Sequence, residues 1–172
     1  MCLRAESRDR RLPGGPSVRL RPLRPSDRDI YARAVIDLSP RSRYLRFLAP
    51  IERPSEKLLD AMTRVDGRRH VAFVVLSPDE TKAVGVVRYV RDGDAPHEAE
   101  AAMAIADDWQ GRGLGRGLLG HAVEHARQAG LHVLRATTLR ENGGAERILH
   151  ATGFTPVRAD GPYAEHRLRL GR

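Results

Sequence analysis

Hydrophobic residues recur along this chain at two different spacings. Alternating or continuous apolar runs predict strands over 18–23, 70–76, 83–90, 98–106, 131–138, 154–157 and 164–170. Apolar positions three and four residues apart predict helices over 26–38, 40–48, 55–62, 114–130 and 142–151. In the helix over 40–48 we expect Tyr44, Leu45 and Phe47 to face inward. Strands interleaved with helices predict an α/β fold, with helices packed on one central sheet.

The length and composition bound the domain organisation. With 172 residues, 41% of them hydrophobic, the chain is long enough for one domain with a substantial core. Residues 1–16 show no periodicity, and we expect them to form a disordered basic tail. Residues 17–172 are expected to form a single domain.

The charge is strongly positive but does not by itself indicate nucleic acid. The formal net charge is +8, whereas aromatic residues make up only 5% of the chain. Without aromatic residues interleaved among the basic ones, a base-stacking surface is not expected. No apolar run has membrane-spanning length and no segment matches a signal peptide, so we expect no membrane partner and a cytoplasmic location. The sequence leaves open whether the protein is a monomer or a dimer.

The stretch with the most specific chemistry is Trp109-Gln110-Gly111-Arg112-Gly113-Leu114-Gly115-Arg116-Gly117-Leu118-Leu119. It follows a predicted strand and runs directly into an amphipathic helix. A helix N-terminus offers unpaired backbone N–H groups, and glycines allow a ligand to approach the backbone. Arg112 and Arg116 add positive charge. The pattern therefore predicts a site for a ligand with a pyrophosphate.

The same residues carry a family resemblance. Gln110-Gly111-Arg112-Gly113-Leu114-Gly115 resembles the Q-x-x-G-x-G acyl-CoA signature of the GNAT superfamily of N-acetyltransferases, and Asn142 and Gly153-Phe154 follow in the order typical of that superfamily. Other segments resemble the GNAT domain of bacterial protein lysine acetyltransferases of the Pat type. These segments are Ser39–Phe47, Val65-Asp66, Arg69–Ala72, Gly85–Val90 and Ala99-Glu100.

The resemblance implies a particular fold and donor site. The expected sheet is mixed and mostly antiparallel, with helices on both faces and a splayed strand pair that holds acyl-CoA. The strand over 98–106 is expected to bulge, so that backbone groups of Met103, Ala104 and Ile105 are free and one N–H serves as oxyanion donor. The implied acetyl-CoA contacts are Met103, Ala104, Ile105, Gln110, Gly111, Arg112, Gly113, Leu114, Gly115, Arg116 and Asn142.

Acetyl transfer to an amine needs a base, because fewer than about one lysine in a thousand is neutral at pH 7. Glu100 matches the family's catalytic glutamate by its Ala99-Glu100-x-Ala setting, and we expect it to take the proton directly or through one water. Glu98, two residues earlier on the same face, is the alternative. Many relatives place a tyrosine seven residues after the asparagine to protonate the leaving thiolate, and here that position is Leu149.

Two other motifs have simpler interpretations. His121-Ala122-Val123-Glu124-His125 fits H-x-x-E-H, but its helix already begins as a phosphate site and no third ligand stands out, so we expect no metal. Gly115–Gly120 formally fits G-x-G-x-x-G, yet these glycines lie on the helical stripe rather than directly after a strand. Dinucleotide binding is therefore not expected. Arg41, Arg43 and Arg46 are most simply the solvated face of their helix.

Three functions remain open at this level. The first is an acetyl-CoA-dependent N-acetyltransferase, with a protein lysine as the expected acceptor. The second is a small-molecule acetyltransferase for polyamines or aminoglycosides, since Glu98, Glu100, Asp92 and Asp94 could form an acidic cluster. The third is a catalytically weak acyl-CoA-binding sensor, which Leu149 would suit. The presence of Glu100 favours an enzyme.

Overall fold

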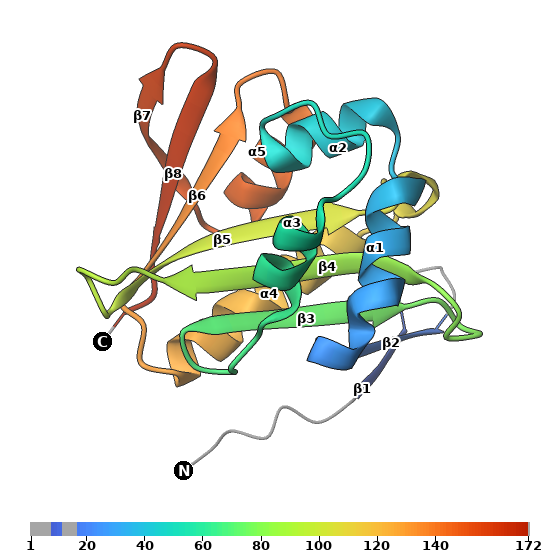
Figure 1. Ribbon diagram of the computed structural model, residues 1–172. Helices are drawn as coiled ribbons and strands as arrows, with labels where there is room; N and C mark the ends of the chain where they lie inside the picture. Colours follow the sequence, from blue (N-terminus) through green and yellow to red (C-terminus); the bar gives the residue numbers. More distant parts are fainter. Residues whose placement is uncertain (1–7, 12–16, 172) are drawn as a thin grey trace.

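The computed structural model describes residues 8–11 and 17–171 and places them in one central sheet covered by helices (Figure 1). The strands are β1 (Arg8–Arg11), β2 (Ser17–Pro22), β3 (His70–Leu76), β4 (Ala83–Arg91), β5 (Glu98–Ile105), β6 (Val133–Leu139), β7 (Thr155–Asp160) and β8 (Tyr163–Arg169). The helices are α1 (Arg28–Asp37), α2 (Pro40–Phe47), α3 (Glu56–Thr63), α4 (Leu114–Gln128) and α5 (Gly143–Ala151). Two short 3-10 turns, Pro25–Asp27 and Asp107–Trp109, precede α1 and follow β5.

The sheet has the order β1-β2-β3-β4-β5-β6-β8-β7. Every neighbouring pair is antiparallel except β5 and β6, which are parallel. The predicted mixed, mostly antiparallel sheet is therefore confirmed. A parallel pair needs a crossover connection, and here α4 supplies it between β5 and β6.

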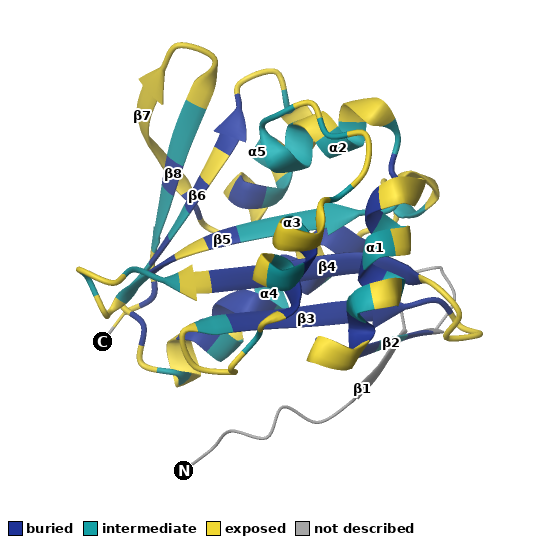
Figure 2. Ribbon diagram, viewed as in Figure 1, coloured by how far each residue is buried: buried dark blue, intermediate teal, exposed yellow. Residues whose placement is uncertain are grey.

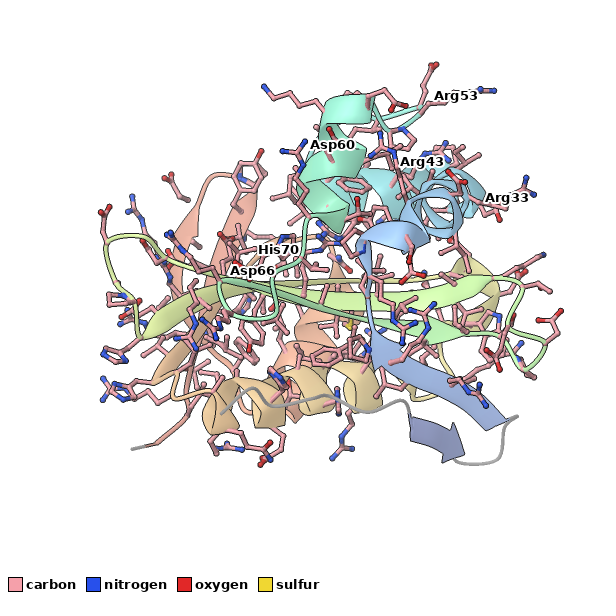
Figure 3. All side chains as sticks on the ribbon, turned by 60° about the horizontal axis from the view of Figure 1, so that its bottom comes forward. Arg33, Arg43, Arg53, Asp60, Asp66 and His70 are labelled. Atoms are coloured by element: carbon pink, nitrogen blue, oxygen red, sulfur yellow. The ribbon has the colours of Figure 1, made fainter. Side chains whose placement is uncertain are left out.

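Helices cover both faces of the sheet, as predicted (Figure 3). On one face, α4 packs its apolar stripe on Val71, Phe73 and Val75 of β3 and on neighbouring strands. On the other face, α1 and α3 pack on Ala72, Val74 and Leu76 of the same strand. Strand β3 is thus buried on both sides (Figure 2), which explains why its sequence is a continuous apolar run instead of an alternating one.

The structure differs from the predicted N-terminal tail at Arg8–Arg11, which form β1 and pair antiparallel with β2. An edge strand can be held by backbone hydrogen bonds alone, so its sequence need not show apolar alternation. Residues 1–7 and 12–16 lie outside the described part of the chain. Among the described residues, no helix is long and apolar enough to cross a membrane.

A buried polar cluster fixes α5 against the sheet. The Thr138 hydroxyl of β6 donates to Glu146 Oε1 at 2.7 Å, and His166 Nε2 of β8 lies 2.9 Å from the same oxygen. Thr138 and His166 are both buried, so each would be costly to leave unpaired. The cluster holds the start of α5, and with it Asn142, in a fixed place.

Candidate active site

Strands β5 and β6 part in the middle of the sheet and leave an opening. They pair only at Glu98↔Val133, Ala99↔Leu134 and Glu100↔Arg135, although both strands continue beyond these residues. Figure 1 shows β6 diverging from β5 after this short parallel ladder. The predicted splayed pair is therefore present.

The predicted bulge is absent. The register between β4 and β5 runs without a shift from Arg91↔Ala99 to Gly85↔Ile105. The prediction was wrong on this point because the opening needs no extra residue: β5 stays paired with β4 while β6 turns away.

The hydrogen-bond alternation along β5 determines which backbone groups face the opening. The N–H of Asp92 donates to Glu98 O, and that of Ala106 donates to Val84 O, both at 3.0 Å. Even-numbered residues of β5 therefore bond to β4, and odd-numbered residues turn their backbone groups toward β6. Met103 thus presents its N–H and C=O groups to the opening, and Ile105 its N–H, while the Ile105 carbonyl accepts from Gln110 Nε2 at 3.1 Å. The backbone of Ala104 is directed to β4. The expectation of a free backbone at Ala104 was wrong.

The loop after β5 has the backbone geometry of an anion site. Gly111 and Gly113 have φ of 72° and 79°, a region that favours glycine. Helix α4 begins at Leu114, and its first recorded backbone bond runs from Gly117 N–H to Gly113 O at 3.2 Å. The preceding N–H groups have no acceptor within the helix, so they can bind a phosphate.

Gly115 is required for a different reason, which is helix packing. A Cβ on Gly115 would lie 2.7 Å from Ile148 Cδ1 of α5. The absence of a side chain therefore lets α5 approach the start of α4. This contact places Asn142, at the N-terminus of α5, opposite the glycine loop.

One cavity of about 360 Å³ joins these parts. It is lined from β5 and the loop by Met103, Ala104, Ile105, Gln110, Gly111, Gly113, Gly115 and Arg116, from α1 and α2 by Leu38, Ser42, Leu45 and Arg46, and from α5 by Asn142, Gly144, Ala145, Arg147 and Ile148. The Asn142 side-chain oxygen accepts from Ala145 N–H at 3.1 Å, which leaves its amide NH₂ available to a ligand.

Two predicted donor-site residues do not line this cavity. Leu114 is 3% exposed and packs in the core, so only its backbone N–H can serve a ligand. Arg112 is exposed and its guanidinium lies over the Trp109 ring, 5.4 Å from the centroid. The sequence pattern could not separate these two from Gly113 and Arg116, because it shows that a helix begins here but not which side faces the cavity.

A smaller cavity of about 80 Å³ lies where β5 and β6 part. It shares Arg46, Met103 and Asn142 with the larger one, and Thr137 and Leu149 also line it. The two cavities therefore form a path from the glycine loop into the strand opening. Leu149 lies in this path, at the position where many relatives have a tyrosine, and contributes no hydroxyl.

Glu100 and Glu98 differ sharply in their surroundings. Glu100 is the last β5 residue that pairs with β6, its side chain is exposed, and its Oε1 accepts from Thr137 Oγ1 at 3.2 Å. Both carboxylate oxygens of Glu98 accept from Arg167 Nη2 at 3.2 Å, and Arg135 Nε lies 3.6 Å away. Of the two, Glu100 is the carboxylate that is free to take a proton at the opening.

Helix α2 is tied above the opening by Asp107, which the sequence did not suggest. Its carboxylate accepts from Ser39 N–H at 2.9 Å and from the hydroxyls of Ser39 and Ser42 at 2.8 and 2.7 Å. Burial favours the protonated acid, but these hydrogen bonds outweigh it and hold the pKa of Asp107 below its usual value. The ionised Asp107 therefore anchors α2 to the end of β5.

This placement corrects the predicted faces of α2. Tyr44 was expected to face inward but is 40% exposed. Arg43 and Arg46 were expected to be solvated, yet Arg43 Nη1 donates to the carbonyls of Ile36 and Leu38, and Arg46 lines the cavities. Arg43 is held by carbonyls at the C-terminal end of α1, and Arg46 meets the site instead of bulk water because α2 lies across the opening.

The two histidines of the H-x-x-E-H pattern belong to the packing of α4. The rings of His121 and His125 lie edge-on to Phe73, with centroids 4.5 and 5.1 Å away, and His125 Nδ1 is 2.8 Å from the Tyr89 hydroxyl. Among the described residues, no group of three or more His, Cys, Asp or Glu side chains could hold a metal ion.

The parted strands, the open N-terminus of α4 and the joined cavities together define the acetyltransferase class that uses an acyl-CoA donor. The acetyltransferase (GNAT) domain family matches residues 17–155, and the chain belongs to this family. It is 34% identical over 163 residues to Acetyltransferase PA5475 of Pseudomonas aeruginosa, covering 92% of this chain and 87% of that protein.

Two further comparisons point to the Pat type. The chain is 30% identical over 141 residues to Acetyltransferase Pat of Mycolicibacterium smegmatis, which covers 82% of this chain but 42% of that protein. The solved GNAT domain of S. lividans PAT superposes with a TM-score of 0.88 and 27% identity, over 95% of this chain and 96% of that one. The chain is thus similar to Pat over the acetyltransferase domain and spans less than half of the mycobacterial protein.

Proposed function

We propose that the protein transfers the acetyl group of acetyl-CoA to the side-chain amine of a protein lysine, with Glu100 as general base. The observation that carries this proposal is the position of Glu100, an exposed and unneutralised carboxylate at the point where β5 and β6 part. Lysine as the acceptor is supported by the resemblance to bacterial protein lysine acetyltransferases of the Pat type, together with the similarity to Pat proteins over this domain.

The residues present fit acetyl-CoA. Gly111 and Gly113 hold the loop open at positive φ, and the N–H groups at the start of α4 can bind the pyrophosphate with Arg116. Asn142 offers its amide from the opposite side. The bound donor supplies a thioester that an amine can attack directly. Met103 N–H, which faces the opening, donates to the thioester oxygen as negative charge develops there.

Glu100 supplies the base that a charged lysine requires. It takes a proton from the ammonium group, directly or through one water, and so provides the neutral amine. Because Leu149 has no proton to give, the CoA thiolate leaves without a protein acid. This is feasible because a thiol has a pKa near 8.5, so the thiolate is a good leaving group.

The structure disfavours a polyamine or aminoglycoside as acceptor. That alternative needs a cluster of free carboxylates, but Glu98 is bound by Arg167 and Arg135, and Arg135 also pairs with Asp92 at 2.5 Å. Glu98 and Asp92 are thus neutralised by neighbouring arginines, whereas the exposed Asp94 belongs to the turn before β5. Glu100 is left as the free carboxylate at the opening, which suits the single side-chain amine of a lysine residue.

The acceptor class is tested by supplying the wild-type protein with acetyl-CoA and either a bacterial protein extract or a mixture of polyamines. We expect release of CoA thiol with the extract and acetyl-lysine in its peptides by mass spectrometry. Turnover with polyamines alone would overturn the lysine proposal. Binding of acetyl-CoA without turnover in either pool would favour the sensor alternative.

A further inference from the structure

Arg88 of β4 is a buried cation without a carboxylate partner. Arg88 is 3% exposed. Its Nη1 donates to Met62 O at 2.8 Å and lies 3.0 Å from His70 Nε2. Its Nε and Nη2 are buried and have no hydrogen-bond partner among the described residues. A buried, half-satisfied guanidinium is costly, and burial lowers the pKa of Arg88 to about 10.

Arg46 of α2 is a second cation close by. In the described part of the chain its guanidinium forms no hydrogen bond or ion pair, and it lies 4.9 Å from the centroid of the adjacent Phe47 ring. Besides burial, the charge of Arg46 lowers the pKa of Arg88, so the two cations are close enough to repel each other. Arg46 also lines both site cavities and a third space of about 30 Å³ that contains Tyr31.

Among the described residues, no anion forms an ion pair with either arginine. The ring of Tyr31 lies 5.3 Å from the Arg88 guanidinium, and both burial and Arg88 lower the pKa of His70, which is therefore neutral at pH 7. Figure 3 shows His70 beside Asp66, but the Asp66 carboxylate accepts the backbone N–H groups of residues 68–70. Glu100 attracts Arg46 but forms no ion pair with it.

The pair lies on the acceptor side of the reaction. In the β4–β5 ladder Arg88 is opposite Ala102, and Glu100 is opposite Val90. Arg88 and Glu100 are therefore diagonal neighbours on one face of the sheet, with Cα atoms about 7–8 Å apart. An amine at Glu100 would therefore place a group a few bonds away near Arg46, which interacts electrostatically with both Glu100 and Arg88.

We propose that Arg46 and Arg88 form a carboxylate subsite, so that the acceptor is an amine with a carboxylate close to it. Arg46 binds the carboxylate directly, and Arg88 adds its uncompensated charge from the adjacent strand. The carboxylate can belong to an acidic side chain next to the target lysine or to a free amino acid. This inference rests on the proposed function and adds a requirement to its acceptor.

The test compares acceptors that differ only in the carboxylate. Two lysine peptides carry either glutamate or glutamine beside the lysine, and leucine is paired with leucine amide. For whichever pair contains the acceptor, we expect the carboxylate form to have a KM about tenfold lower or more, with little change in kcat. The active pair identifies the source of the carboxylate. Equal KM values within both pairs would overturn the subsite.

Variants test whether the two arginines cause the lower KM of the carboxylate form. Arg46→Gln should abolish this preference, while Arg41→Gln, which removes the same charge from an exposed position on α2, should preserve it. Arg88→Lys should preserve it and Arg88→Met should weaken it, with folding of each variant checked by circular dichroism. Equal loss in the Arg41 and Arg46 variants would show a general charge effect and overturn the subsite.

A binding measurement separates this inference from the proposed function. Calorimetry with the N-acetylated products of both acceptor pairs needs no turnover. If no amine is acetylated but the carboxylate form of either pair binds more tightly in an Arg46-dependent way, the subsite stands and the proposed function fails. If protein lysines are acetylated and both forms of each pair bind equally, the proposed function stands and the subsite fails.

Discussion

At the scale of single residues, Glu98 and Glu100 show that two glutamates on the same face of one strand can have different roles. Glu98 is held by Arg167 and Arg135 between β5, β6 and β8, whereas Glu100 has one hydrogen bond from Thr137 and is open to solvent. The difference comes from β6, which still pairs with β5 at both residues but turns away immediately after Glu100. Glu98 therefore stabilises the strand junction, and Glu100 borders the opening.

The first prediction concerns Glu98→Gln. Removing this partly exposed charge should lower the free energy of unfolding by about 0.5–1 kcal/mol and leave the acetylation rate close to that of wild type. Urea unfolding and CoA-thiol release measure the two quantities. A large loss of rate with unchanged stability would transfer the base role to Glu98.

The second prediction concerns Leu149→Tyr. Leu149 lines the 80 Å³ space between the strands, so a tyrosine there could give a proton to the departing thiolate. We expect kcat to rise by up to about tenfold near pH 7, with a smaller gain at higher pH, where the thiolate leaves without help. Leu149→Phe is the matched control, since it adds the ring without the hydroxyl. An equal gain in both variants would show that packing, not proton transfer, is responsible.

At the scale of elements, the approach of α5 to α4 depends on one missing side chain. Gly115→Ala should place a Cβ against Ile148 Cδ1, force α5 outward, cost about 1–3 kcal/mol and weaken acetyl-CoA binding at Asn142. Ile148→Val removes the same Cδ1 atom. The double variant should therefore recover most of the stability and binding, as measured by thermal unfolding and calorimetry. Additive losses in the double variant would contradict this packing account.

Most elements could be predicted because their patterns are local. The continuous apolar run predicts β3, the apolar stripe predicts α4, and the glycine signature predicts where α4 begins. Strand β1 could not be predicted, since its pairing with β2 is a backbone interaction that leaves no side-chain pattern. The bulge expected in β5 was also wrong, because the divergence of β6 is a property of two strands and not of one sequence.

The candidate site was predictable to a similar extent. The residues from Met103 to Arg116 follow one another in sequence, so one motif predicts most of them. Arg46 was assigned to solvent, because helical spacing cannot show that α2 lies across an opening in the sheet. Arg88 was hidden for the opposite reason: an arginine within a strand run gives no sign that it is buried without a counter-ion.

At the scale of the whole molecule, the half-buried His125 and His70 couple stability to pH. Burial, and to a smaller extent the charge of Arg91, lowers the pKa of His125 from 6.5. Burial raises the pKa of Tyr89 to about 12, so the Tyr89 hydroxyl, which lies 2.8 Å from His125 Nδ1, keeps its proton. His125 is then neutral in the folded state but binds a proton in the unfolded chain near pH 6.5. Stability is therefore retained above that pH and falls as the pH drops through it toward the lower folded value.

The corresponding prediction is a lower urea midpoint at pH 5.5 than at pH 7.5. His125→Gln should reduce this difference, and His70, whose pKa burial and Arg88 also lower, should account for part of the remainder. His132→Gln, at an exposed position, is the control and should retain the full difference. A wild-type midpoint that is equal or higher at pH 5.5 would contradict the assignment.

The central claim is that Glu100 performs proton transfer at a donor site built by β5, α4 and α5. It is tested most directly by measuring acetyl-CoA binding and acetyl transfer to protein lysines for wild type and Glu100→Gln under the same conditions. We predict equal binding constants and a rate lower by about 10²–10⁴-fold in the variant. Equal rates in the two proteins would contradict the claim, because a glutamine cannot accept the proton.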